Sequence, residues 1–238
     1  MLRNFSISLV MSFLLVQPAL QGQGVIDKGY IKIEVVDVKT EDSQMAAMAD
    51  MFKNSFTEVY FLPQKSLTKL SMMGGMTTTT ILADEKSENN LYLLSFMGQK
   101  IKLDLTKEEL AKMQAGENKA SDVKIKYFKD QKRTILGYSC HKAEMVVNST
   151  QEVAMTLWVT EQIKSNAQVA QGMEANMLKG FPLAYELSVQ GQFTMVMEAT
   201  KLEKDFDKTV FNVNTKGYKT MTFDEFMESM GGMMGGMK

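Results

Sequence analysis

Residues 57–105 read TEVYFLPQKSLTKLSMMGGMTTTTILADEKSENNLYLLSFMGQKIKLDL, and this stretch decides the fold. It divides into short segments rich in β-branched, aromatic and aliphatic residues: Thr57–Leu62, Ser66–Met72, Met76–Ala83, Leu91–Phe96 and Gln99–Leu105. They are separated by Pro63, Gly74-Gly75, Glu85–Asn90 and Gly98, which are turn signals. Short strands at this spacing predict an antiparallel meander, with Gly74-Gly75 as a hairpin turn.

The sequence before this stretch predicts a strand and then a helix. Tyr30–Lys39 alternates apolar and polar residues, as a half-buried strand does. From Ser43 the period changes, and Met45, Met48, Phe52 and Phe56 fall on one face of a predicted helix over residues 43–56. This apolar face predicts a lid or plug that faces the sheet.

The sequence after the stretch predicts a second series of strands. Thr106 and Glu109 form a capping-box pattern at the start of a short helix. Further segments are predicted as strands at 122–128, 134–136, 138–147, 152–160, 183–189, 192–202 and 210–213, and as helices at 164–178 and 223–230. With no break in composition, we expect one α+β domain, mainly antiparallel β: a curved half-barrel sheet with a few helices on or in its concave face.

The first 24 residues have the pattern of a secretory signal peptide. Arg3 precedes an apolar run from Phe5 to Val16, and Pro18 and small residues follow it. We therefore expect residues 1–24 to be a signal peptide, 25–222 a single domain, and 223–238 a short helix with a flexible Met/Gly-rich tail. The expected location is periplasmic or extracellular, without a lipid anchor because no cysteine lies near the exit; an uncleaved N-terminal anchor is the alternative.

Composition argues against several classes of function. Without residues 1–24 the chain carries 26 Lys and Arg against 28 Asp and Glu, so it lacks the basic excess of a nucleic-acid binder. No later segment is long and apolar enough for an integral membrane protein. Cys140 and His141 are the single cysteine and histidine, and neighbours on a strand point to opposite faces, so they do not form a catalytic dyad. We expect no catalytic residue, no cofactor and no enzymatic activity.

Methionine is the unusual residue of this chain. The sequence holds 22 methionines, with similar clusters at 71–76 and 230–237. Thioethers are soft ligands that suit Cu(I), so Met230, Met233, Met234 and Met237 are candidate metal ligands. The alternative is that these side chains serve as adaptable apolar packing groups.

Three phrases of the sequence resemble a known family. Residues 135–145 (ILGYSCHKAEM), 195–204 (MVMEATKLEK) and 211–221 (FNVNTKGYKTM) are similar to motifs of an exported bacterial family of unknown function that is common in Bacteroidota. Asn214 and His141 stand where that family more often has Pro and Lys. The resemblance implies a half-barrel like that of the lipoprotein carriers LolA and LolB, whose concave apolar face holds acyl chains under a helical lid. Those carriers place an important Arg in the cavity, whereas Arg133 falls in a predicted turn, 129–133.

These observations favour an exported, non-enzymatic binding protein for a lipid, an acyl chain or another apolar ligand in the cell envelope. The candidate ligand-binding residues are Met45, Met48, Phe52 and Phe56. The alternatives are a Met-rich periplasmic Cu(I)-binding protein and a structural or interaction domain whose core is filled and holds no ligand.

Overall fold

The computed structural model describes residues 24–40, 43–115, 123–147, 153–167, 169, 178–189 and 193–235. Its strands are β1 (Gly29–Thr40), β2 (Phe56–Leu62), β3 (Lys65–Met72), β4 (Thr77–Asp84), β5 (Asn89–Phe96), β6 (Gln99–Thr106), β7 (Val123–Ile135), β8 (Tyr138–Val147), β9 (Val153–Thr160), β10 (Phe181–Val189), β11 (Phe193–Glu203) and β12 (Lys219–Thr220). The helices are α1 (Ser43–Phe52), α2 (Lys107–Ala115) and α3 (Phe223–Gly235), with 3₁₀ turns η1 (Met73–Gly75) and η3 (Lys208–Phe211).

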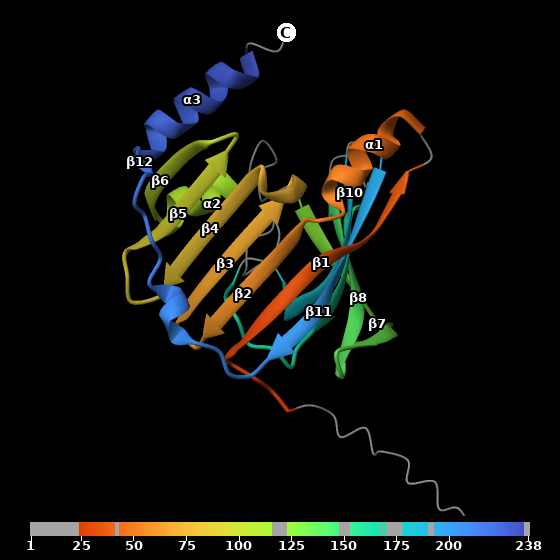
Figure 1. Ribbon diagram of the computed structural model, residues 1–238. Helices are drawn as coiled ribbons and strands as arrows, with labels where there is room; N and C mark the ends of the chain where they lie inside the picture. Colours follow the sequence, from red (N-terminus) through yellow and green to blue (C-terminus); the bar gives the residue numbers. More distant parts are fainter. Residues whose placement is uncertain are drawn as a thin grey trace, which may run out of the picture.

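All of these strands belong to one open sheet, in the order β12-β6-β5-β4-β3-β2-β1-β11-β10-β9-β8-β7 (Figure 1). Neighbouring strands run antiparallel except β12, which pairs in parallel with β6. The sequence meander β2–β6 forms one half of the sheet and the meander β7–β11 forms the other. β1 joins the halves because it pairs with β2 on one side and with β11 on the other.

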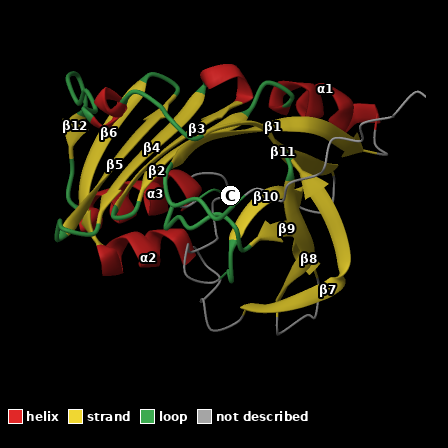
Figure 2. Cartoon of the chain, turned by 90° about the horizontal axis from the view of Figure 1, so that it is seen from below, coloured by secondary structure: helices red, strands yellow, loops and turns green. Residues whose placement is uncertain are grey.

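The sheet bends strongly where the two halves meet. Figure 2 shows β7–β10 turning down from the plane of β1–β6, with α2 on the inner side of the bend. The register of β1 against β11 shifts twice, after Lys32 and after Val35, and such bulges bend a strand and increase its twist. The expected α+β half-barrel, mainly antiparallel, is therefore confirmed.

Two apolar clusters lie on the inner side of this sheet. The larger one gathers side chains of β1, β2 and β7–β11, and it includes Phe61, Leu157 and Phe181. The smaller one joins Tyr92, Leu103 and Leu105 of β5 and β6 to Phe226 of α3. β5 and β6 thus have a packing centre separate from that of β1, β2 and β7–β11 inside one continuous sheet.

The segment after β11 crosses the outer face of the sheet before it reaches α3 (Figure 1). Phe206 packs edge-on against Tyr60 of β2 at a ring-centroid distance of 5.4 Å, and against Phe211 at 6.0 Å. Lys100 of β6 lies over the ring of Tyr218, 5.7 Å from its centroid. The segment then turns around the edge strand β6, where β12 pairs, and continues into α3.

Four local predictions were wrong. β7 is one strand from Val123 to Ile135, with a bulge between Phe128 and Lys132, so Arg133 lies on a strand and not in a turn. α1 ends at Phe52, and Phe56 is the first residue of β2. Residues 164–167 are not helical, and 170–177 lie outside the described residues. The predicted strand at 210–213 is replaced by the 3₁₀ turn η3 and the residues after it.

Candidate ligand-binding site

The inner face of β2–β6 is free of charged side chains. Alternate residues of a strand point to opposite faces, and residues directly paired across strands share a face. Thr57, Val59 and Phe61 of β2 therefore share a face with the inward residues of the next strands, which are Ser66, Thr68, Leu70, Thr79, Ile81, Ala83, Asn90, Tyr92, Leu94, Ile101, Leu103 and Leu105. None of these residues is ionisable at neutral pH.

The charges of the same strands point the other way. The outward positions carry Glu58, Lys65, Lys69, Asp84, Lys100, Lys102 and Asp104. Several of these charges are paired, as Lys65 is with Asp84 at 3.4 Å and Lys102 with Asp104 at 2.8 Å. β2, β3, β4 and β6 thus separate an uncharged inner row from an outer row that carries charge, and the inner face is suited to an apolar ligand.

Four residues of this inner face, Leu70, Thr79, Ile81 and Leu94, form what we call the inner strip. They lie on β3, β4 and β5, with Thr79 paired to both Leu70 and Leu94. All four are only half-buried, whereas Val59 on one side and Leu103 on the other are fully buried. The described side chains of the two apolar clusters therefore leave the middle of the inner face partly uncovered.

One side of the inner strip is bordered by α2 and α3. Thr106 caps α2: its hydroxyl accepts from the Glu109 N–H at 3.2 Å, and the Glu109 carboxylate accepts from the Thr106 N–H at 2.8 Å. The same reciprocal pair, Thr222 with Glu225, begins α3. Such boxes satisfy helix N–H groups that have no intrahelical partner. They start α2 and α3, whose residues Leu110, Met113 and Phe226 pack against β5 and β6.

The other side is bordered by the second half of the sheet. Phe181 of β10 stacks on Phe61 of β2 with ring centroids 6.3 Å apart. Tyr185 is buried beside them and donates a hydrogen bond to the Val169 carbonyl at 3.3 Å. Burial raises the pKa of Tyr185 to about 12, and the neighbouring Thr57 opposes that rise. A phenol held neutral in this way supplies a polar contact without a charge.

Tyr92 has a similar position on β5. Burial raises its pKa, and a hydrogen bond with Thr79 acts in the opposite direction. The hydroxyls of Tyr92 and Thr79 therefore place polar groups at the inner strip. A few polar groups on a largely apolar wall can orient a ligand without making the wall costly to desolvate.

The structure brings one predicted lid residue to the sheet. The ring of Phe52, at the end of α1, packs on Phe193 of β11 at a centroid distance of 5.3 Å. Met45 and Met48 lie in α1, but their side chains are outside the described residues. Phe56 lies on the outer face, where Lys32 Nζ is 5.1 Å from its ring centroid, so it cannot share a lid surface with Phe52.

The methionines predicted to bind a metal lie outside the part of the chain whose side chains the structure describes. Met230, Met233 and Met234 lie in α3 with side chains outside the described residues, and Met237 is itself outside them. Among the residues that the structure describes, no group of three or more His, Cys, Asp and Glu side chains is arranged to hold a metal ion.

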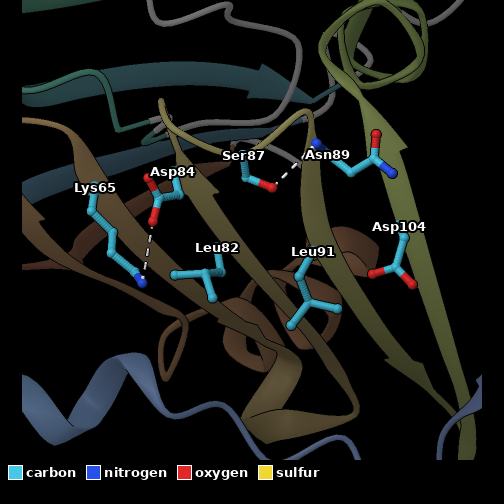
Figure 3. Close-up of a pocket in the computed structure, with 7 residues that line it drawn as sticks. All are labelled: Lys65, Leu82, Asp84, Ser87, Asn89, Leu91 and Asp104. Atoms are coloured by element: carbon cyan, nitrogen blue, oxygen red, sulfur yellow. Dashed lines mark hydrogen bonds and ion pairs between the residues drawn. The ribbon is translucent and has the colours of Figure 1, made fainter.

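A polar depression of about 400 Å³ on the outer face is a second concave feature (Figure 3). Lys65, Asp84, Ser87, Asn89 and Asp104 surround it together with two leucines. The backbone N–H of Lys86 and the Lys65 ammonium hold the pKa of Asp84 below its usual range, so this carboxylate stays charged and paired. A paired, surface-exposed carboxylate of this kind is poorly suited to act as an acid or base near neutral pH.

Cys140 and His141 do not act together. The Cys140 thiol is buried and donates to the Tyr138 carbonyl at 3.7 Å, while the His141 ring packs on Tyr127 at 5.7 Å between centroids. Arg133 forms an ion pair with Glu198 and lies over Trp158, 5.7 Å from its ring centroid. These contacts fix the end of the β7–β8 hairpin against β9 and β11, which is a structural role.

The geometry defines an open, strongly bent antiparallel half-barrel whose inner face is uncharged across β2–β6. The family model described as "Domain of unknown function (DUF4412)" matches residues 42–216, and the chain belongs to this family. The predicted relation to a family of unknown function is confirmed. The comparison with curated proteins gives no match.

Several solved structures are similar over most of their length. An uncharacterized conserved protein from Thermus thermophilus is 9% identical, with a TM-score of 0.42 over 82% of this chain and 90% of that one. A LolA superfamily protein from Nitrosomonas europaea is 9% identical, with a TM-score of 0.32 over 78% and 90%. A putative outer membrane lipoprotein-sorting protein domain from Vibrio parahaemolyticus is 7% identical, with a TM-score of 0.32 over 78% and 89%. These likenesses assign no ligand to this chain.

The inner strip was not singled out from the sequence, although part of its signal is present there. The row of outward charges is readable as period-two alternation, for example Lys100, Lys102 and Asp104 around Ile101 and Leu103. In Thr77–Thr80 every residue is the same, so nothing in the sequence tells which threonine faces inward.

Within the described residues, none of the helices is both long and apolar enough to span a membrane.

Proposed function

We propose that this chain is an exported, non-enzymatic binding protein whose inner strip holds an apolar ligand, such as the acyl chain of an envelope lipid. The observation that carries the proposal is the uncharged inner face of β2–β6, which is only partly buried at Leu70, Thr79, Ile81 and Leu94. Leaving apolar side chains partly exposed forgoes about 25 cal/mol for each Å² that could be buried, and a bound chain would recover this free energy.

The residues around the strip support an elongated ligand. α2 and α3 border it on one side and β10 on the other, so a chain lying along Leu70, Thr79 and Ile81 would contact apolar groups from several elements. Tyr92 and Thr79 would meet a polar atom of such a ligand. In this proposal residues 1–24 direct export, and residues 25–222 form the binding domain.

In this proposal α1 would act as the lid. Of the predicted lid residues in α1, Phe52 is the one whose side chain the structure describes. Phe52 is half-buried and packs on the buried ring of Phe193, so its separation from the sheet would uncover an apolar surface that a ligand could contact. Phe56 takes no part because it lies on the outer face.

The run Thr77–Thr80 offers a matched experiment. Thr79→Trp would fill the inner strip, whereas Thr78→Trp adds the same ring one residue away on the outer face. We expect the first variant to weaken binding of a fluorescent fatty acid by about tenfold or more, which is about 1.4 kcal/mol, and the second to leave it within about twofold.

Circular dichroism and urea unfolding of both variants establish that each is folded. Equal binding by folded Thr79→Trp and Thr78→Trp proteins would overturn the inner strip as the site. Native mass spectrometry of protein purified from its own envelope adds an independent readout, in which the wild type should carry a co-purifying lipid.

A further inference from the structure

Three methionines meet at neighbouring turns on one end of the sheet. Met73 and Met76 belong to the β3–β4 turn, and Met97 to the β5–β6 turn. The Met76 N–H donates to the Met73 carbonyl at 3.3 Å, and the Met97 N–H donates to the Met76 carbonyl, also at 3.3 Å. Two successive backbone hydrogen bonds thus hold the three residues next to one another, although Met97 is distant from the others in sequence.

Two of these methionines have a backbone conformation that is unfavourable for residues with a side chain. φ is +51° at Met73 and +48° at Met97, in the left-handed region that Gly and Asn adopt more readily. A methionine there costs free energy, and Met97, which is 70% exposed, gains little from packing in return. Met76 is 46% exposed, and Met73 is half-buried. Met76 and Met97 therefore present exposed thioether side chains, and the half-buried Met73 lies beside them.

The turn that carries Met73 is fixed in place and open. Ser55, which is buried, accepts a hydrogen bond from the Met73 N–H at 3.1 Å and so ties the turn to the chain just before β2. A Cβ added to Gly74 or to Gly98 would meet no atom within 4 Å. The space beside Gly74 in one turn and beside Gly98 in the other is therefore open, which leaves room for an ion to approach the turns.

We propose that Met73, Met76 and Met97 form a binding site for a soft monovalent metal ion, Cu(I), with three thioether sulfurs as ligands. Thioethers select Cu(I) over harder ions such as Zn(II) or Mg²⁺. Methionine has three rotatable side-chain bonds, so sulfurs from adjacent turns can converge on one ion without movement of the backbone. No oxidation or reduction is involved, because Cu(I) binds and leaves as Cu(I).

The same end also exposes Phe96, and an apolar tip of this kind could instead meet a membrane. Residue type favours the metal: Met73, Met76 and Met97 supply three thioethers, whereas Leu, Ile, Val and Trp do not occur at these tips. The site is independent of the inner strip and of the tail methionines 230–237.

The test is an anaerobic titration of the full chain with Cu(I) supplied as its bicinchoninate complex. The wild type should bind one equivalent at this site. Replacing Met73, Met76 and Met97 together by Leu, which conserves volume, should remove that equivalent, and Met97→Leu alone should weaken it by about tenfold or more. Leu at Met230, Met233, Met234 and Met237 should leave it intact.

Met97→Asn separates the ligand from the fold. Asn suits a positive φ better than Met does, so this variant should be at least as stable as the wild type and still lose Cu(I). Retention of the equivalent by the folded triple variant, or its loss only in the tail variant, would overturn the proposal. So would a triple variant that binds Cu(I) normally but no longer binds phosphatidylethanolamine–phosphatidylglycerol vesicles. Fatty-acid binding by the triple variant should equal that of the wild type, so the two proposals fail separately.

Discussion

At the scale of single residues, Cys140 shows how burial sets chemistry in this fold. Burial raises the pKa of its thiol from 9.0 to about 11, and the nearby Arg133 guanidinium only partly opposes that rise. The thiolate is the reactive form, so a thiol with this pKa is almost entirely unreactive near neutral pH. The fold therefore keeps this unpaired cysteine neutral and buried.

The raised pKa of Cys140 predicts a specific dependence of stability on pH. The folded state holds the thiol proton more tightly than the unfolded state, so its contribution to stability is complete below pH 9 and is lost as pH rises towards 11. We expect the free energy of unfolding to fall more steeply between pH 9 and 11 in the wild type than in Cys140→Ala. Urea unfolding at several pH values measures this, and parallel curves for the two proteins would contradict it.

At the scale of elements, α3 covers one end of the inner face, and Phe226 is its buried residue in the smaller apolar cluster. The next residue, Met227, is 46% exposed. Phe226→Ala should reduce the free energy of unfolding by about 2–4 kcal/mol, because it removes a buried ring and leaves a cavity. Met227→Ala should change it by less than about 0.5 kcal/mol. Chemical denaturation distinguishes them, and equal effects would show that α3 is not packed as described.

The start of β10 depends on a glycine in a similar way. Gly180 has φ +117°, and a Cβ there would lie 2.5 Å from the Thr160 carbonyl oxygen. Gly98 also has a positive φ, +86°, but a Cβ there would meet nothing within 4 Å. Gly98→Ala should therefore cost only the backbone strain, about 1 kcal/mol, whereas Gly180→Ala should cost clearly more. Thermal unfolding tests the order, and a more stable Gly180→Ala than Gly98→Ala would contradict it.

The local elements were predictable where the sequence carries a local signal. The capping box of Thr106 and Glu109 and the turn at Gly74-Gly75 follow from nearby residues, and both are present. The end of α1 was not predictable, because Phe56 fits a helical period and a strand equally well. Its place in β2 comes from pairing with Glu34 and Ser71, which are distant in sequence.

At the scale of the whole molecule, the open sheet and its antiparallel order follow from the rhythm of short strands, and its curvature was expected mainly from the family resemblance. The pairing of β1 with β11 could not be predicted from the sequence, since it joins residues near the two ends of the chain. The candidate site was missed for the same reason: Leu70, Thr79, Ile81 and Leu94 become neighbours only through the register of β3, β4 and β5. The lid was predicted from the apolar face of α1, and Phe52 is the predicted lid residue of α1 with a described contact to the sheet.

The central claim is that the inner strip holds an apolar chain, and photo-crosslinking tests it most directly. A palmitic acid that carries a diazirine along its chain would be irradiated with the full protein, and the labelled residues would be located by mass spectrometry. The account predicts labels on Leu70, Thr79, Ile81 or Leu94, competed by unlabelled palmitate. Labels confined to outer-face residues such as Leu82 and Leu91, or label that unlabelled palmitate does not reduce, would contradict it.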